Sequence, residues 1–286
     1  MSIDRALAAR LPALHEQQER QETANVLASD QAAAMGVTSR DWGDGLWSVR
    51  CGRAPHHEPG NQITGVTVDA LDRLVAILPW FDEAGCACHV RLPGPVLEAK
   101  LGARMAGLGF VAHELEAWMA APVATVEAAA RSMRRADGPR PDIRPVTSAR
   151  DVEAFLAALW VGWSIEGEAR RAIAGAAMGP FPGPPWWRRY VAFVDGRPAA
   201  EAVMALFEEG VAYLADAATV PAFRKRGLQR ALIARRAEDA RAAGAEHLFG
   251  AVQYGDASWA NMRALGLTEA YMTLRFRRPP AEARTA

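Results

Sequence analysis

The sequence VPAFRKRGLQRAL, residues 220–232, decides the expected fold and chemistry of this chain. It puts a strand end, a proline, three cationic residues, one glycine and the start of a helix in direct succession. Glycine lets a backbone come close to a ligand, and the first turn of a helix has unpaired N–H donors and a dipole that favours anions. The turn therefore predicts an anion site that suits a pyrophosphate. Basic residues before a helix are also common on solvated surfaces, so the turn alone leaves that alternative open.

The segments around this turn follow a regular order of strands and helices. Hydrophobic periodicity and turn residues predict a short strand near 143–144, a helix over 149–163, three antiparallel strands within 189–220 that turn at 195–196 and 209–210, a helix over 228–244, a strand over 247–253, a helix over 257–266 and a strand over 268–278. The turn is not a P-loop, because GxxxxGK[ST] is absent, and it lacks the three glycines of a dinucleotide fingerprint.

The first half of the chain repeats part of this order. Residues 69–85, 86–94 and 104–119 run parallel to residues 228–244, 245–253 and 261–276, which puts Gly85 opposite Gly244 and Gly109 opposite Gly266. We further expect a helix over 3–34, a strand over 41–51, a loop over 53–62, a strand over 63–68, a helix from 69 with Asp69 as its N-cap, a strand over 86–94, a helix over 95–109 and a strand over 110–120. A composition change around DGPRP, residues 137–141, predicts two related domains, 1–135 and 136–286.

This order of elements resembles the GNAT superfamily of acyl-CoA-dependent N-acetyltransferases, most closely over about residues 141–278. In that family a (Q/R)xxGx(G/A) turn holds the CoA pyrophosphate, and here it appears as RKRGLQ, with Arg224 and Gly227 matching and Gln229 in place of the last small residue. The resemblance implies an α/β fold of two tandem domains, each a central mixed sheet flanked by helices. It also implies acetyl-CoA as cosubstrate and no metal.

The resemblance further implies which residues would contact the cosubstrate. The strand ending at Val220 would separate from its neighbour, its backbone would pair with the pantetheine arm, and the helix over 257–266 would line the other side. The implied contact residues are Ala218, Thr219, Val220, Arg224, Lys225, Arg226, Gly227, Leu228, Gln229, Arg230, Ser258 and Asn261. For the last two, helix capping or exposure to solvent is the alternative role.

Acetyl transfer to an amine needs a base for the amine and an acid for the leaving thiolate. Asp216 and Glu201 lie on the strands that lead to the turn and are our candidate bases, with a surface or structural role as the alternative. The family's usual tyrosine acid would fall at Met262, so the sequence departs from the pattern there. Tyr254 is our candidate substitute and Tyr271 a second one, although a tyrosine in this region can equally serve packing.

The first copy is expected to have lost its CoA site. Asp69 and Asp72 occupy the region where the second copy has cations, and they would repel a pyrophosphate. Cys86, Cys88 and His89 form a CxCH cluster, but no second ligand pair follows at zinc-finger spacing, so we predict two buried structural cysteines and no metal.

The composition limits the partners of the protein. With 33 basic and 33 acidic residues, nothing global indicates nucleic acid or an anionic membrane. Three unevenly placed cysteines favour a reducing compartment, which predicts a cytoplasmic protein. Five aromatic residues of the second half can wall a pocket for an apolar amine or serve ordinary packing: Trp160, Trp163, Phe181, Trp186 and Trp187.

The predicted function is thus transfer of acetyl from acetyl-CoA to a small-molecule amine. A non-catalytic acyl-CoA-binding or regulatory protein is the alternative, which the missing tyrosine keeps open. Acetylation of a protein amine is a third reading that the sequence does not exclude.

Overall fold

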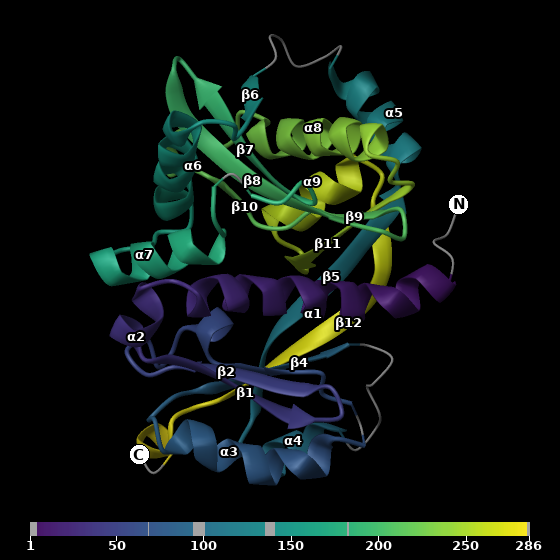
Figure 1. Cartoon of the computed structure of the whole chain (residues 1–286). Coiled ribbons are helices and arrows are strands. Elements are labelled where there is room, and N and C mark those ends of the chain that lie inside the picture. The colour runs from purple at the N-terminus through teal and green to yellow at the C-terminus, as the bar shows by residue number, and fades with distance from the viewer. Residues whose placement is uncertain (1–4, 68, 94–100, 135–140, 182, 285–286) are drawn as a thin grey trace. The chain divides into compact units, whose positions relative to one another are not determined.

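The computed structural model describes residues 5–67, 69–93, 101–134, 141–181 and 183–284. The chain divides into two compact units (Figure 1). The larger unit comprises Met1–His15 and Ala117–Ala270, and the smaller unit comprises Glu16–Glu116 and Tyr271–Ala286. Strands β5 (Val111–Pro122) and β12 (Thr268–Arg278) each contribute residues to both units. The mixed sheet flanked by helices confirms the predicted fold class, whereas the domain limits 1–135 and 136–286 remain a prediction.

The larger unit is built on a mixed sheet with the strand order β11-β9-β8-β7-β6. Its strands are β6 (Asp142–Pro145), β7 (Trp187–Val194), β8 (Arg197–Phe207), β9 (Val211–Tyr213) and β11 (His247–Gln253), and β10 (Ala217–Thr219) also pairs with β8. The pairs β6–β7, β7–β8 and β8–β9 are antiparallel, and β11 runs parallel to β9.

Helices pack closely on this sheet because its central strand carries small side chains. In β8, Ala199, Ala200, Ala202 and Ala205 are fully buried. Helices α6 (Ala149–Gly162) and α8 (Leu228–Ala242) both contact β8, and α5 (Val123–Arg134) contacts α8. The unit also contains α7 (Glu168–Ala177), α9 (Ala257–Ala264) and the first part of α1 (Arg5–Leu27).

Local signals define the start of α6. Ser148 is its N-cap and accepts a hydrogen bond from the Asp151 backbone N–H at 3.2 Å, while the Asp151 carboxylate accepts from the Ser148 backbone N–H at 2.9 Å. This capping box satisfies donors that a helix N-terminus leaves unpaired. The hydrogen bonds from Ser148 and Thr147 lower the pKa of Asp151, so the cap stays charged in neutral solution.

The smaller unit has the strand order β1-β2-β3-β4-β12. Its other strands are β1 (Val37–Gly43), β2 (Leu46–Cys51), β3 (Gln62–Thr64) and β4 (Cys88–Pro93), and its helical segments include η1 (Glu58–Gly60), η2 (Leu71–Arg73), α3 (Leu74–Asp82) and α4 (Leu101–Gly107). Leu74, Ile77 and Phe81 form one buried face of α3 at helical spacing. Cys86 and Cys88 are buried free thiols in the same core, as predicted.

Several predicted elements of the first half were wrong in detail. The helix expected over 3–34 is two helices, α1 (Arg5–Leu27) and α2 (Gln31–Met35). The strand expected over 41–51 is instead the hairpin of β1 and β2, because Asp44 and Gly45 adopt positive φ angles of 52° and 81° and form its turn. Asp69 is not a helix N-cap, since η2 is capped by Ala70 and α3 by Arg73.

The helix expected over 95–109 is seen as α4 alone, because residues 94–100 lie outside the described ranges. Helices α5 and α7 were not predicted. No helix within the described ranges is long and apolar enough to cross a membrane.

Candidate functional site

The site centres on a break in one strand of the larger unit. Residues 211–219 pair with β8 in two pieces, β9 and β10, and at the break the Val203 N–H lies 3.4 Å from the Ala215 carbonyl and 2.9 Å from the Asp216 carbonyl. Strand β11 pairs with β9, and its last bond to this segment runs from the Leu214 N–H to the Phe249 carbonyl. Within the described part of the chain, β10 pairs with β8 alone. The strand therefore separates from β11 as predicted, and one edge of β10 is open for an extended ligand.

Backbone alternation identifies the residue that faces this open edge. The Val220 N–H donates to the Ala199 carbonyl of β8, so the peptide groups of Thr219 point to the other side of the strand. The Thr219 carbonyl accepts a hydrogen bond there from Arg224 Nε at 3.2 Å. Among the three predicted backbone contacts, Thr219 is thus better placed than Ala218 or Val220.

The end of α6 lies directly against β10. A Cβ atom on Gly162 would come within 2.6 Å of the Ala218 Cβ, which real Cβ atoms do not approach, so glycine is needed at this contact. Arg224 Nη2 also reaches the Gly162 carbonyl at 3.4 Å. Arg224 therefore ties the strand end to the helix end.

The basic turn connects β10 to α8 through η4 (Pro221–Phe223). Arg224, Lys225 and Arg226 are exposed, and the Arg226 guanidinium lies 5.5 Å from the centre of the Phe223 ring. Gly227 is the N-cap of α8 with a positive φ of 74°, and no side chain caps the helix. The first-turn N–H donors of α8 are thus left for an anion, beside three cations.

Polar side chains connect the start of α8 to α9. Asn261 Nδ2 donates to Gln229 Oε1 at 2.6 Å, and Gln229 Nε2 donates to Ser258 Oγ at 2.6 Å. The structure brings these three predicted residues together. It directs two others elsewhere: the Leu228 side chain is buried, and Arg230 contacts the Met133 sulfur of α5 at 3.9 Å.

Glu201 is a fully buried carboxyl group directly opposite Ala218 in the β8–β10 register. Its Oε1 accepts a hydrogen bond from the Trp163 indole N–H at 3.2 Å, and Trp163 itself is 52% exposed. Burial first and the negative charge of Asp216 second raise the pKa of Glu201 to about 8, and the Trp163 bond opposes them. With this pKa the carboxyl group is mostly protonated at neutral pH, and its ionised fraction, which grows as the pH rises toward 8, suits a general base.

Sequence reasoning missed Arg236, which holds the strand break together. This fully buried guanidinium donates to the Val203 carbonyl at 2.7 Å, to the Ala215 carbonyl at 3.0 Å and to the Leu232 carbonyl at 3.3 Å. Burial lowers its pKa to about 10, which still leaves it charged in neutral solution. The signal was present in the sequence, because Arg236 follows Leu228 and Leu232 at four-residue spacing on the apolar face of α8.

The candidate acid is less well supported by the geometry. Tyr254 is half exposed, and its ring packs against Trp259 with 5.2 Å between ring centres. None of the contacts seen in the described residues joins Tyr254 to Glu201. Met262 is buried, and its Cε would lie 2.8 Å from a Cβ on Gly250. Tyr271 belongs to the smaller unit.

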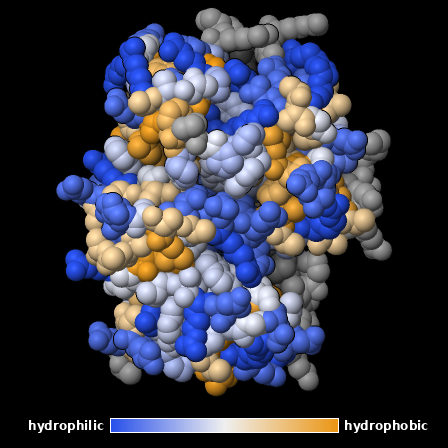
Figure 2. All heavy atoms as spheres, in the orientation of Figure 1, coloured by the Kyte–Doolittle hydropathy of each residue, from blue (hydrophilic) through white to orange (hydrophobic). Residues whose placement is uncertain are grey.

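The five predicted pocket aromatics have different environments. Trp187 is buried and donates to the Met178 carbonyl, with Trp186 packed on it edge to face. Trp160 donates to the Arg171 carbonyl of α7, and Phe181 lies under the Arg189 guanidinium. Trp163 alone among the five contacts a candidate catalytic residue. Figure 2 shows hydrophobic residues at the surface in the region of α6, whose end carries the exposed Val161 and Trp163.

Comparisons with known proteins agree with this geometry. Residues 151–267 match the sequence model of the Acetyltransferase (GNAT) family. No curated protein matches the sequence.

Solved structures share the fold over most of the chain. A GCN5-related N-acetyltransferase from Kribbella flavida has a TM-score of 0.62 at 18% identity, covering 97% of this chain and 98% of that one. A GCN5-related N-acetyltransferase from Sphaerobacter thermophilus has a TM-score of 0.56 at 13% identity, covering 84% and 83%. A tandem GNAT protein from the clavulanic acid biosynthesis pathway has a TM-score of 0.55 at 14% identity, covering 81% and 77%. The chain thus shares the fold of these structures, among them a tandem GNAT protein, and residues 151–267 match the GNAT family model.

Proposed function

We propose that this protein is a cytoplasmic N-acetyltransferase that moves the acetyl group of acetyl-CoA to the amine of a small molecule. The observation that carries the proposal is the open edge of β10, which leads into an uncapped, cationic helix N-terminus and lies beside the buried Glu201. An extended ligand with a pyrophosphate at one end and a reactive group at the other fits this succession of sites. The GNAT family match supports acyl transfer in general.

In this proposal the basic turn binds the cosubstrate. The N–H donors that follow Gly227 and the charges of Lys225 and Arg226 bind the pyrophosphate. The pantetheine arm pairs with the open edge of β10, while Gln229, Ser258 and Asn261 offer polar contacts from α8 and α9. The Thr219 N–H faces the thioester oxygen and stabilises the negative charge that develops on it.

The chemical step then needs a neutral amine. Glu201, in its ionised form, takes a proton from the acceptor ammonium, directly or through water, and the amine attacks the thioester carbonyl carbon. The C–S bond breaks, and the CoA thiolate leaves and takes up a proton. Asp216 assists by keeping the Glu201 pKa close to neutral pH. Tyr254 remains our candidate for the acid at the thiolate.

A binding test examines the cosubstrate site. CoA affinity is measured by calorimetry for the wild type, Arg226→Glu, Gly227→Asp and the control Arg150→Glu, which changes an exposed arginine in the first turn of α6. Each change at the turn puts a carboxylate beside the pyrophosphate, so we expect at least a tenfold loss of affinity, equivalent to about 1.4 kcal/mol. Undiminished affinity in both turn variants would refute the site.

A turnover test examines catalysis separately. Thiol release from acetyl-CoA is followed across a library of small amines, for the wild type and for Glu201→Gln. Turnover with one acceptor class that Glu201→Gln abolishes supports the proposal. CoA binding without turnover on any amine would instead favour a non-catalytic CoA-binding protein, which the buried Met262 at the family's tyrosine position keeps as the second candidate.

A further inference from the structure

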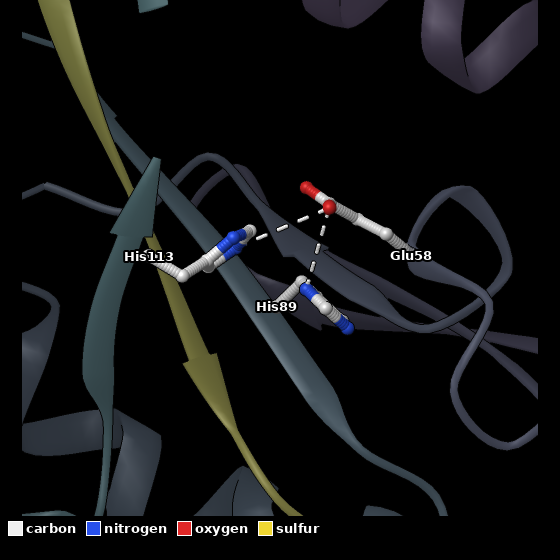
Figure 3. Close-up of side chains that lie close together, drawn as sticks. All are labelled: Glu58, His89 and His113. Carbon is white, nitrogen blue, oxygen red and sulfur yellow. Dashed lines mark ion pairs between the residues drawn. The ribbon is translucent and has the colours of Figure 1, made fainter. Parts of the chain in front are cut away.

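The smaller unit contains a cluster of side chains that the proposed acetyl transfer does not use. Figure 3 shows Glu58, His89 and His113 turned toward one another from three segments, the η1 turn, β4 and β5. His89 Nδ1 lies 3.6 Å from Glu58 Oε2, and His113 Nε2 lies 4.0 Å from the same oxygen. One ligand atom from each residue falls within a span of 4.8 Å.

His89 is the residue that most needs a partner. Its side chain is 6% exposed, and neither of its ring nitrogens has a hydrogen-bond partner among the residues that the structure describes. The 3.6 Å distance to Glu58 is too long for a hydrogen bond. A buried imidazole without partners is unfavourable, because it has lost its bonds to water and gained none in return. A ligand between the three residues would supply the missing interaction.

Glu58 is oriented for such a ligand by an arginine. Arg275 Nε donates to Glu58 Oε1 at 2.6 Å, which leaves Oε2 turned toward both histidines. Interactions of this kind, in which a neighbour fixes the direction of a ligating carboxylate, are usual around metal sites. The two rings meet nearly at right angles, at 82°, with 5.7 Å between their centres.

The surrounding charge can accommodate a cation. Glu58, Glu114 and Glu116 all lie within 4.0 Å of Arg275, and Glu116 also pairs with Arg91, which pairs in turn with Glu19. Arg277 lies nearby, 3.4 Å from the ring of His56. Four carboxylates thus outnumber three guanidinium groups by one. These side chains thus carry a net charge of −1 before an ion binds. A divalent cation would therefore bind among groups that are slightly negative overall and would not be repelled by a net positive charge.

We propose that Glu58, His89 and His113 bind one divalent transition-metal ion that prefers imidazole ligands, as Zn²⁺ does. Bond lengths of about 2.0–2.2 Å to a tetrahedral ion put ligand atoms roughly 3.4 Å apart. The two distances to Glu58 Oε2, 3.6 Å and 4.0 Å, are already near this value, and the 4.8 Å span of the cluster has to shorten by about 1.4 Å at most through side-chain rotation. Three protein ligands leave the fourth position for water, and His113, whose side chain is 30% exposed, marks the open side. The cysteines of the CxCH motif are not part of this group, whose ligand atoms come from Glu58, His89 and His113.

The test uses the full chain freed of metal with a chelator. Zn²⁺ alone is titrated by calorimetry, and thermal unfolding is followed with and without it. We expect one Zn²⁺ per chain and a rise in Tm, since an ion that binds only the folded state stabilises it. His113→Gln and Glu58→Gln should each lose at least tenfold in affinity, whereas the control His247→Gln, on β11 of the larger unit, should bind like the wild type.

A further variant separates loss of metal binding from loss of folding. His89→Phe fills the buried position with an apolar ring, and we expect a wild-type circular dichroism spectrum together with loss of the Zn²⁺ response. Co²⁺ in the wild type should give the intense visible absorption of a four-coordinate site. Absence of Zn²⁺ binding by the wild type at 100-fold molar excess would overturn the proposal, as would binding that is unchanged in both His113→Gln and Glu58→Gln.

Discussion

The buried carboxyl of Glu201 makes the stability of the protein depend on pH in an unusual direction. Its pKa is raised from an ordinary value of 4.5 to about 8 in the folded protein. Between these values the folded state binds a proton that the unfolded state has released. Stability therefore falls as pH rises from 4.5 through 8, which is the opposite of the behaviour of a salt-bridged carboxylate.

The size of the effect follows from the same two values. From pH 6 to pH 9, ionisation of this one group should cost about 3 kcal/mol of unfolding free energy, at 1.36 kcal/mol for each pKa unit. Glu201→Gln keeps the shape of the side chain and the acceptor for the Trp163 indole but removes the titration. The variant should thus lack this loss, and its melting temperature at pH 9 should exceed that of the wild type by roughly 5–10 °C.

The assay is thermal unfolding of the wild type and Glu201→Gln in matched buffers from pH 5 to pH 9.5. Glu209→Gln is the control, since it changes a glutamate that is 44% exposed and pairs with Arg10 at the surface. A constant difference in Tm between Glu201→Gln and the wild type across this range would refute the reasoning. So would a difference of the same size in Glu209→Gln.

Three further predictions use the same measurements. Asp216→Asn removes a negative charge that raises the Glu201 pKa, so the loss of Tm should level off at a lower pH and be smaller at pH 9; an unchanged profile would contradict this electrostatic coupling. Arg236→Met leaves the Val203 and Ala215 carbonyls without their buried donor and should cost about 2–4 kcal/mol in denaturant unfolding, and it should also weaken CoA binding measured by calorimetry; wild-type stability would show that the strand break does not need the guanidinium. Ser148→Ala removes the N-cap of α6 and should cost about 1 kcal/mol with no change in CoA affinity, and a neutral effect on unfolding would mean that the cap is not used.

The sequence predicts the elements best where turn residues, such as glycine and proline, and the hydrophobic periodicity indicate the same boundaries. In the second half, glycines and prolines mark the limits of α8, β11, α9 and β12, and each element lies where it was expected. In the first half the same type of signal predicts one strand over 41–51, whereas Asp44-Gly45 forms the turn of a hairpin. Helix α7 has no buried residues, so its hydrophobic pattern gave little to recognise.

Only the part of the site that is continuous in the sequence could be predicted. The turn at 224–229 is continuous in sequence, so its place before α8 could be inferred from motif and order alone. Contacts across the fold could not, because neither the Trp163–Glu201 hydrogen bond nor the approach of His113 to Glu58 leaves a mark in sequence spacing. Arg236 stands between these cases: its place on an apolar helix face was visible, but its partners are carbonyl groups whose position depends on the strand break.

The close contact between Gly162 and Ala218 couples the position of the end of α6 to the position of β10. Because α6 touches β10 with no room for even one methyl group at Gly162, a shift of the helix end displaces the strand as well. Trp163 follows Gly162 directly, and Thr219 follows Ala218. In the proposed reaction Trp163 meets the acceptor and Thr219 the thioester, so we expect a displacement of one to be passed on to the other. An acceptor that pushes the indole aside would also realign the acyl group, and enlarging this region to admit new amines would alter turnover as well as affinity.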